Sequence, residues 1–312
     1  MPRDILIIGS GMAGLTAYHI LNKSGFHCLM LEKARGVGGR MTHRRHELGG
    51  YDHGTSSFKV SAPIFKDFLE NFVSEGILEL HEGWATPKPA GNALAKALSP
   101  SGDDFLPQAH VVDVELTDNL VRLTDAQGAV HEGTKLLITC PMPQAKALLG
   151  QYWDAHWPHA DHVSYRPVLT MMLALEKPQD GNELARLMGA GDATIIWESD
   201  KPERAEGRRL VVHFDEDATL PFLQTDLKEI ARHMSGILED AGVGLLNIQA
   251  HRWLYAHTKS AMAGEMLAHQ SLPIWVAGDG FGLDGVETAF LSAHAAALDI
   301  IEGSDPHPDG KG

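Results

Sequence analysis

Three glycines, Gly9, Gly11 and Gly14, form the pattern Gly-x-Gly-x-x-Gly directly after a short apolar run, Ile5–Ile8. This spacing is typical of a loop that binds the pyrophosphate of a dinucleotide. The first glycine permits a tight turn, the second lets the backbone approach the anion, and the third lets a helix pack closely on the strand. The anion then lies at the N-terminus of that helix, where free N–H groups and the helix dipole favour negative charge.

A carboxylate and a second glycine loop follow. Glu32 ends the next apolar run, 18 residues after Gly14, where it can bind the hydroxyls of an adenosine ribose. Residues 35–41 then read Arg-Gly-Val-Gly-Gly-Arg-Met. Such a loop can place backbone N–H groups and the Arg40 guanidinium beside a pyrophosphate that already touches the first loop. The first glycine loop with Glu32 predicts dinucleotide binding but leaves NAD and FAD both open; this second loop is one of two features that decide between them.

A third segment near the C-terminus favours FAD. The apolar run 273–277 ends in Gly278-Asp279, and a helical pattern begins near Val286. The end of this strand would bring Asp279 and a close backbone to an extended group such as a ribityl phosphate. The helix would direct its positive end at the N1–C2=O edge of a flavin, which gains negative charge on reduction.

The elements needed to position these residues can be predicted from the same sequence. Buried strands are expected at 5–8, 27–32 and 135–139, and further strands at 110–115, 120–124, 168–175, 209–214 and 273–277. Helices are expected at 15–23, 63–73, 223–241 and 286–301. The pattern predicts an α/β fold, a Rossmann-type FAD-binding domain with an inserted β-rich (α+β) substrate domain. We expect residues 1–60, 96–150 and 248–312 in the FAD-binding domain, and residues 61–95 and 151–247 in the substrate domain.

Composition excludes several function classes. The chain has 312 residues, 44% apolar and 21% charged, as in globular proteins. Its net charge of −15 repels phosphate backbones, so nucleic acid is not an expected partner. No apolar run is long enough to span a membrane. Two cysteines cannot build a disulfide framework, which favours a soluble protein of the reducing cytoplasm.

In this order, the three cofactor segments resemble the FAD-binding pattern of the amine oxidase superfamily. More narrowly, the chain resembles the renalase family over most of its length. The segments that carry this resemblance are Gly38–Met41, Cys140–Ala145 (CPMPQA), Lys201–Arg204 (KPER), His251–Ala256 (HRWLYA), and Gly278-Asp279 with Val286-Glu287.

The resemblance implies non-covalent FAD and transfer of a hydride from a small reduced substrate to flavin N5. Oxygen then reoxidises the flavin and forms hydrogen peroxide. Renalases act in this way on wrongly reduced isomers of dihydronicotinamide dinucleotides. The expected cofactor residues are Gly9, Gly11, Met12, Ala13, Gly14, Glu32, Lys33, Gly39, Arg40, Met41, Gly278, Asp279, Val286 and Glu287.

The sequence departs from the family around the substrate. Ser57 and Gly280 stand where members of the family place large rings, although Phe58 and Phe281 are one position away. The segment Gly76–Trp84 is also shorter than its renalase counterpart. We therefore expect a wider or differently shaped pocket. Its expected residues are Ser57, Phe58, Trp197, His213 and Phe281.

Acid–base, metal and covalent chemistry have weaker signals. His213 is the candidate acid–base residue, with a structural histidine as the alternative, and packing is favoured for His251 and Trp253. Hydride removal from a dihydropyridine needs little acid–base help because its product is an aromatic cation. His156-x-x-His159-x-x-His162 is the nearest approach to a metal-site spacing, and we expect no metal.

Two other functions remain open at this stage. The chain could be a flavin amine oxidase or a desaturase-type dehydrogenase, or a FAD-binding protein without turnover. Neither Cys28 nor Cys140 lies near the segment expected to hold the isoalloxazine, so a covalent flavin is not expected. The sequence leaves the exact substrate, the electron acceptor and the oligomeric state undetermined.

Overall fold

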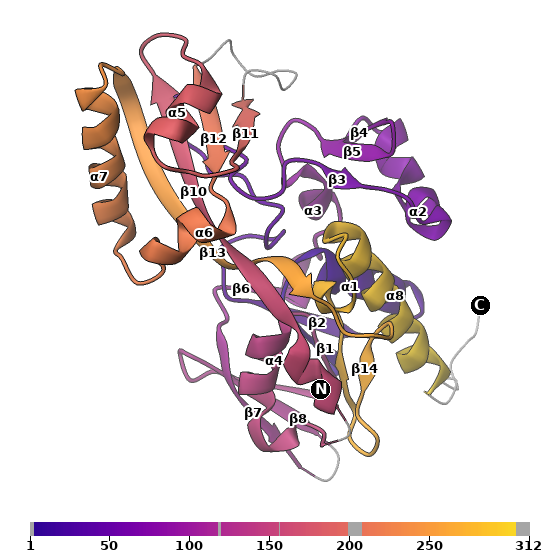
Figure 1. Cartoon of the computed structure of the whole chain (residues 1–312). Helices are drawn as coiled ribbons and strands as arrows, with labels where there is room; N and C mark the ends of the chain where they lie inside the picture. The colour runs from indigo at the N-terminus through magenta and orange to yellow at the C-terminus, as the bar shows by residue number, and fades with distance from the viewer. Residues whose placement is uncertain (1–2, 118–119, 156, 199–207, 304–312) are drawn as a thin grey trace.

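Three β-sheets and the helices packed on them organise the chain (Figure 1). The computed structural model describes residues 3–117, 120–155, 157–198 and 208–303. The segment Lys201–Arg204, His156 and the tail after residue 303 lie outside these described residues. Within them, none of the helices has the length and apolar character needed to cross a membrane.

The largest sheet has eight strands and carries the dinucleotide motif. Along its main path the order is β14-β15-β9-β1-β2-β6, and β1 pairs in parallel with both β2 and β9. Its strands are β1 (Arg3–Ile8), β2 (Cys28–Glu32), β6 (Phe105–Pro107), β7 (Val111–Leu116), β8 (Val121–Asp125), β9 (Val130–Ile138), β14 (Leu267–Ala268) and β15 (Ile274–Val276).

Both faces of this sheet are covered, which explains the continuous apolar runs in its central strands. Ile5 and Ile7 pack on one face against α1 (Met12–Lys23) and α8 (Val286–Glu302). Leu6 packs on the other face, in a second core that includes residues of α4 (Met142–Leu149). The resulting three layers confirm the predicted α/β class with its Rossmann-type unit.

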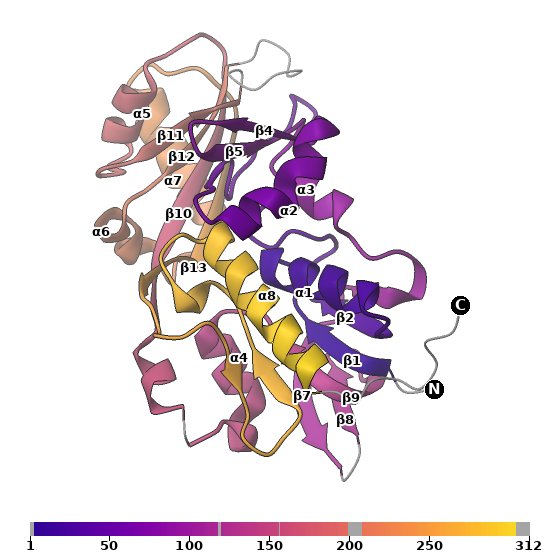
Figure 2. The ribbon, with the colours of Figure 1, turned by 90° about the vertical axis from the view of Figure 1, so that its right-hand side faces the viewer.

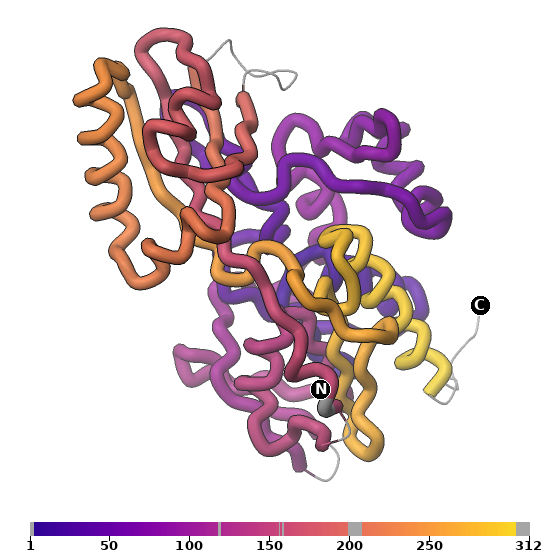
Figure 3. Tube along the Cα trace, viewed as in Figure 1, coloured from indigo at the N-terminus to yellow at the C-terminus, as the bar shows by residue number. Residues whose placement is uncertain are grey.

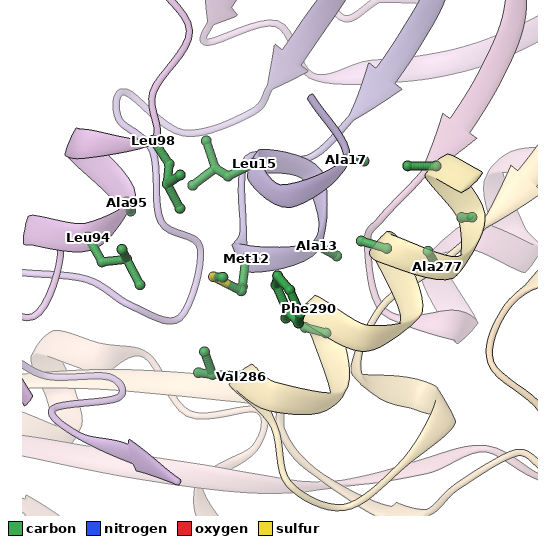
Figure 4. Close-up of a cluster of buried hydrophobic side chains, with 14 of the residues drawn as sticks. Met12, Ala13, Leu15, Ala17, Leu94, Ala95, Leu98, Ala277, Val286 and Phe290 are labelled. Atoms are coloured by element: carbon green, nitrogen blue, oxygen red, sulfur yellow. The ribbon is translucent and has the colours of Figure 1, made fainter. Parts of the chain in front are cut away.

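A small sheet with two helices extends the core around α8. The sheet order is β3-β5-β4, and α2 and α3 accompany it. Phe65 of α2 packs on Phe290 of α8, and Leu94 of α3 belongs to the same core as α1 (Figures 2 and 4). The element bounds are β3 (Phe58–Lys59), α2 (Pro63–Ser74), β4 (Leu78–His81), β5 (Trp84–Pro87) and α3 (Ala93–Ala97).

The third sheet is antiparallel, in the order β11-β12-β10-β13. Strand β13 pairs with β10 along nearly its whole length, and these two antiparallel strands connect the upper and lower parts of the molecule (Figure 3). Helix α7 covers the outer face, and Figure 1 shows it at the left. The elements are β10 (Ser164–Leu175), α5 (Gly181–Leu187), β11 (Thr194–Trp197), β12 (Arg209–His213), α6 (Glu216–Thr219), α7 (Leu227–Asp240) and β13 (Leu245–Ser260).

Most predicted elements are present, with shifted ends. Helix α1 begins at Met12, three residues before the predicted start, because Gly11 is its N-cap residue. Helix α7 begins at Leu227, not at residue 223, because the side chain of Asp226 caps it through the N–H groups of Lys228 and Glu229. Strand β13 crosses residue 248, where a domain boundary was expected.

Candidate cofactor and substrate site

The first glycine loop has the geometry that a pyrophosphate requires. Gly9 has a φ of +101°, which favours glycine, and a Cβ added to Gly14 would lie 2.0 Å from the Gly9 carbonyl oxygen. A Cβ added to Gly11 would meet nothing within 4 Å. No side chain caps α1 at Gly11, so its first N–H groups have no side-chain acceptor there.

The second glycine loop lies directly on the first. The Gly38 N–H donates to the Ser10 carbonyl over 2.8 Å. A Cβ added to Gly39 would lie 3.3 Å from the Gly11 Cα, so the two backbones are in contact there. The two glycine loops are therefore adjacent, as a shared anion site would require.

Glu32 ends β2 beside the first loop and is only 7% exposed. Its Oε2 accepts hydrogen bonds from the Ser10 N–H (2.9 Å) and hydroxyl (2.7 Å), and its Oε1 accepts one from the Ala34 N–H (2.7 Å). These bonds fix the carboxylate, whose two oxygens offer about four acceptor sites. The neighbouring Lys33 is exposed.

Arg40 connects the second loop to two distant segments. Its Nη1 donates to Asp279 Oδ2 over 2.6 Å and to the carbonyls of Tyr255 (2.9 Å) and Ala256 (3.2 Å). The sequence predicted Arg40 beside a pyrophosphate but gave no sign of the bonds to β13. The neighbouring Met41 is 2% exposed and packs in the core.

The Gly278–Asp279 turn supplies the other side of the site. Gly278 has a φ of +151° and donates its N–H to the Ser292 hydroxyl. Asp279 is 3% exposed, and Thr258 donates to its carbonyl oxygen over 2.8 Å. Helix α8 follows, and at its N-cap residue, Gly285, no side chain caps the helix.

Glu287, in the first turn of α8, binds the residues that precede α2. It is 4% exposed, and its Oε2 accepts hydrogen bonds from the N–H groups of Ser61 (2.5 Å) and Ala62 (3.0 Å). Burial alone would raise the pKa of Glu287, but the bonds from Ser61 and Ala62 hold it below its ordinary value. The structure therefore gives Glu287 a role in fixing the start of α2.

The ring of Tyr165, which the sequence did not predict at the site, lies beside Gly280. A Cβ added to Gly280 would lie 3.2 Å from the hydroxyl of Tyr165 on β10. Tyr165 meets Tyr255 of β13 edge to face, with ring centroids 5.5 Å apart. Burial, and after it the nearby Asp279, raises the pKa of Tyr165, so its hydroxyl stays protonated. No sequence pattern could reveal this pair, because it depends on the register between β10 and β13.

The predicted pocket residues do not all come together. Phe58 is 4% exposed and packs on Phe65 in the core, and Trp197 packs with the outer-face core of the antiparallel sheet. His213 lies on the inner face, because it pairs with Thr170 of β10. Ser57 is half-buried, and Phe281 is half-buried against the second core.

His53 packs against β13 on the inner face of the antiparallel sheet. The sequence did not predict His53 as a site residue. The His53 ring lies edge to face with His251 (4.9 Å between centroids) and stacks with Trp253 (5.5 Å). Trp253 Nε1 also donates to the His53 carbonyl over 2.9 Å. Burial, and then nearby Arg44, lowers the pKa of His53 to about 3 and that of His251 to about 4, so both rings are neutral at pH 7.

These observations fit a bound FAD. Two helix N-termini lack side-chain caps, two glycine loops touch, and a fixed carboxylate ends β2. Gly9, Gly11, Gly14, Gly39 and Glu32 would hold the adenosine and pyrophosphate, and Gly278, Asp279 and Val286 would lie along the remainder. Among the described residues, no three His, Cys, Asp or Glu side chains are placed to hold a metal ion.

Comparison with curated proteins gives short matches to L-amino-acid oxidases. One from Echis ocellatus is 33% identical over 88 residues, which is 27% of this chain and 18% of that protein. One from Cerastes cerastes is 38% identical over 73 residues, which is 23% of this chain and 14% of that protein. The matches span less than a fifth of the length of these relatives.

Solved structures share the fold over nearly the whole chain. A protein assigned as a protoporphyrinogen oxidase from Exiguobacterium sp. 255-15 superposes with a TM-score of 0.71 at 12% identity, covering 97% of this chain and all of that one. Wild-type putrescine oxidase bound to putrescine gives a TM-score of 0.65 at 12% identity, covering 97% of this chain and 99% of that one.

Family models account for most of the sequence. An NAD(P)-binding Rossmann-like domain matches residues 7–72, and the flavin-containing amine oxidoreductase model matches residues 79–301, more than half of the chain. This match agrees with FAD as the cofactor and oxidation–reduction as the class of chemistry. The chain belongs to the family of flavin-containing amine oxidoreductases.

Proposed function

We propose that the protein is a FAD-dependent oxidase that removes a hydride from a small reduced substrate, namely dihydronicotinamide isomers of the kind that renalases oxidise. When bound, FAD accepts the hydride at N5 and passes two electrons to oxygen, which takes up two protons and becomes hydrogen peroxide. A small-molecule substrate is the partner proposed. We place the reaction in the cytoplasm, because Cys28 and Cys140 are free thiols.

The observation that carries this proposal is the contact between the His53 and His251 rings, since His251 lies on β13, the strand whose Tyr255 carbonyl accepts a hydrogen bond from Arg40. Hydride loss turns a dihydropyridine directly into an aromatic cation. No side chain has to remove a proton, and a site lined by neutral rings is sufficient. Trp253 adds an aromatic face on which a planar ring can stack.

Residues of this chain bind the cofactor and hold it in a fixed orientation. The N–H groups at the start of α1 would hold the pyrophosphate, and Glu32 would accept the ribose hydroxyls. Arg40 and Asp279 fix the second glycine loop against β13 and the start of α8, so the cofactor groove keeps its shape. Tyr165 and Tyr255 exclude water beside Gly280.

An amine or amino acid is the second candidate substrate, favoured by the matches to L-amino-acid oxidases. Amine oxidation needs the substrate nitrogen neutral. A neutral imidazole such as His251 can accept a proton from an ammonium group, although its lowered pKa of about 4 makes it a weak base.

An anaerobic absorbance titration tests the first proposal. The FAD-loaded protein is mixed with borohydride-reduced NAD, which contains the dihydronicotinamide isomers, and in parallel with ordinary NADH. We expect rapid loss of the oxidised-flavin band with the first donor only. A flavin that stays oxidised with both donors would overturn the proposal. Peroxide formation from an L-amino acid under air would then support the second candidate, and no reduction by any donor would indicate FAD binding without turnover.

A further inference from the structure

We infer that Arg44, His53, His251 and Thr170 form a subsite for an anionic group of the substrate, a carboxylate or a phosphate. This inference rests on the proposed function and adds the chemical class of substrate that the site accepts. The four residues come from the loop after the second glycine motif and from strands β10 and β13 (Figure 1).

The register of the antiparallel sheet brings these groups to one face. Thr170 pairs directly with His213 on one side and with His251 on the other, so the three side chains project from the same face. The loop between Arg44 and Tyr51, which an isolated antiparallel bridge closes, lies on this sheet, because Tyr51 packs with Met172 of β10 and Val211 of β12. His53 follows this bridge and places its ring on His251.

Arg44 is a half-buried cation among neutral partners. Its Nη1 donates to Gln249 Oε1 over 3.3 Å, and its Nη2 lies 3.4 Å from His251 Nδ1. Burial lowers the pKa of Arg44, which shows that the charge is partly removed from water. No carboxylate within the described residues lies within ion-pair distance of it. An external anion would therefore relieve the cost of its burial.

Two buried acidic residues, Asp52 and Glu198, have hydrogen-bond partners of their own. Asp52 Oδ1 lies 2.7 Å from His43 Nδ1, and Asp52 also donates its backbone N–H to Glu198 Oε1 over 2.7 Å. Asp52 is 1% exposed and Glu198 is fully buried. These contacts hold the two carboxylates in place, so they do not neutralise Arg44 through a direct pair.

Two of the buried side-chain polar atoms that have no hydrogen-bond partner among the described residues belong to this cluster. His53 Nδ1 and Thr170 Oγ1 make no hydrogen bond there, although His53 is 4% exposed and Thr170 is fully buried. Buried polar atoms without partners are uncommon in folded proteins. The Thr170 hydroxyl can donate to an anionic oxygen, and so can His53 in the tautomer that carries its proton on Nδ1.

The subsite is displaced along β13 from the Arg40–Asp279 pair. Arg44 follows Arg40 by four residues, and His251 precedes Tyr255 by four residues on β13. Four extended residues span about 13 Å. A substrate that spans this distance would place its anionic group in the subsite and its reacting carbon nearer the Arg40–Asp279 pair.

Calorimetric titration of the FAD-loaded protein tests this subsite without turnover. The ligands are benzoate, phenyl phosphate and the neutral isostere benzamide. We expect one of the two anions to bind more tightly than benzamide by about tenfold to a hundredfold, as lost charge-assisted hydrogen bonds imply. The tighter of the two anions identifies whether the site accepts carboxylate or phosphate. Equal binding of both anions and benzamide would overturn the inference.

Substitutions test whether the residues of the subsite cause the preference for an anion over benzamide. Arg44→Gln should abolish the preference for the anion, whereas Arg45→Gln, at an exposed neighbour, should keep it. Thr170→Val keeps the shape of the side chain and should weaken anion binding severalfold without changing benzamide binding. It also serves if Arg44→Gln fails to fold. A preference that survives both Arg44→Gln and Thr170→Val would contradict the inference.

The two proposals can fail separately. If borohydride-reduced NAD leaves the flavin oxidised while Arg44→Gln removes benzoate or phenyl phosphate binding, the substrate proposal fails and the anion subsite stands. If the flavin is reduced but the anions bind no better than benzamide, the oxidase proposal stands and the subsite fails.

Discussion

Arg40 and Asp279 are 239 residues apart in the chain, yet their side chains form an ion pair of 2.6 Å. Asp279 is almost fully buried, and the Arg40 side chain is 30% exposed. Thr258 of β13 also donates to the Asp279 carboxylate, and Arg40 reaches two β13 carbonyls. One contact thus fixes the second glycine loop, the turn before α8 and the long strand of the antiparallel sheet relative to one another.

Asp279→Asn should therefore weaken both stability and FAD retention. The substitution leaves the Arg40 guanidinium without its carboxylate, and we expect a loss of about 1–3 kcal/mol in the free energy of unfolding. Urea denaturation and the flavin content after gel filtration measure the two effects. The control is Asp284→Asn in the same loop, whose exposed contact with Lys59 should contribute less than about 1 kcal/mol. Equal effects of the two substitutions would show that the buried pair has no special role.

Two glycine substitutions should separate folding from cofactor binding. A methyl group at Gly14 would meet the Gly9 carbonyl oxygen at 2.0 Å, so Gly14→Ala should cost about 3 kcal/mol or more in the free energy of unfolding. At Gly11 the same group enters open space from an ordinary φ of −74°. Gly11→Ala should keep the stability of the apoprotein within about 1 kcal/mol but weaken FAD binding, because the methyl group occupies the approach to the pyrophosphate. Denaturation and FAD titration of both variants check this, and unimpaired FAD binding by Gly11→Ala would contradict it.

Glu32→Gln should lower FAD affinity. The carboxylate accepts hydrogen bonds from the N–H groups of Ser10 and Ala34, and an amide would turn its NH₂ group toward one of these donors. We expect about a tenfold increase in the Kd for FAD, measured by fluorescence titration of the apoprotein. The matched control is Glu115→Gln, an exposed carboxylate on β7 of the same sheet. Unchanged FAD affinity would remove Glu32 from the cofactor site.

Local sequence patterns predicted the conformation of the glycine loops because it depends on residues that lie close together in the sequence. A positive φ at Gly9, an open backbone at Gly11 and a carboxylate at the end of β2 follow from residues that lie close together in the sequence. The same holds for the buried strands, whose apolar runs reflect a sheet covered on both faces.

The substrate side could not be predicted in this way because it depends on contacts between distant segments. His53 meets His251 only because the loop after Arg44 folds onto β13, and Tyr165 meets Tyr255 through the register of two long strands. Trp197 was expected in the pocket, but a shift of one residue along β11 moves a side chain to the opposite face. Glu287 was expected at the cofactor, whereas Ser61 and Ala62 take its carboxylate.

Acid should destabilise the protein through His53. Its pKa is about 3 in the folded state and about 6.5 when unfolded, so below pH 6.5 the unfolded chain binds more protons. Stability is therefore complete above pH 6.5 and falls as the pH drops toward 3, by about 2 kcal/mol at pH 5 for this residue alone. Urea denaturation at pH 7 and pH 5 should show a smaller difference for His53→Gln than for the wild type. His81→Gln, at an 81% exposed side chain, should keep the full difference. The same pH dependence in all three proteins would contradict the assignment.

The flavin should be released intact when the protein is denatured. Cys28 is fully buried within β2, and burial raises the pKa of both Cys28 and Cys140 to about 12, so neither thiol forms the reactive thiolate at pH 7. Neither cysteine belongs to the Gly278–Asp279 turn or the start of α8, the elements expected to hold the isoalloxazine. Acid precipitation of the FAD-loaded protein should therefore leave all of the yellow colour in the supernatant, and Cys140→Ser should behave in the same way. Flavin absorbance that stays with the precipitated wild-type chain but not with Cys140→Ser would show a covalent bond and overturn this prediction.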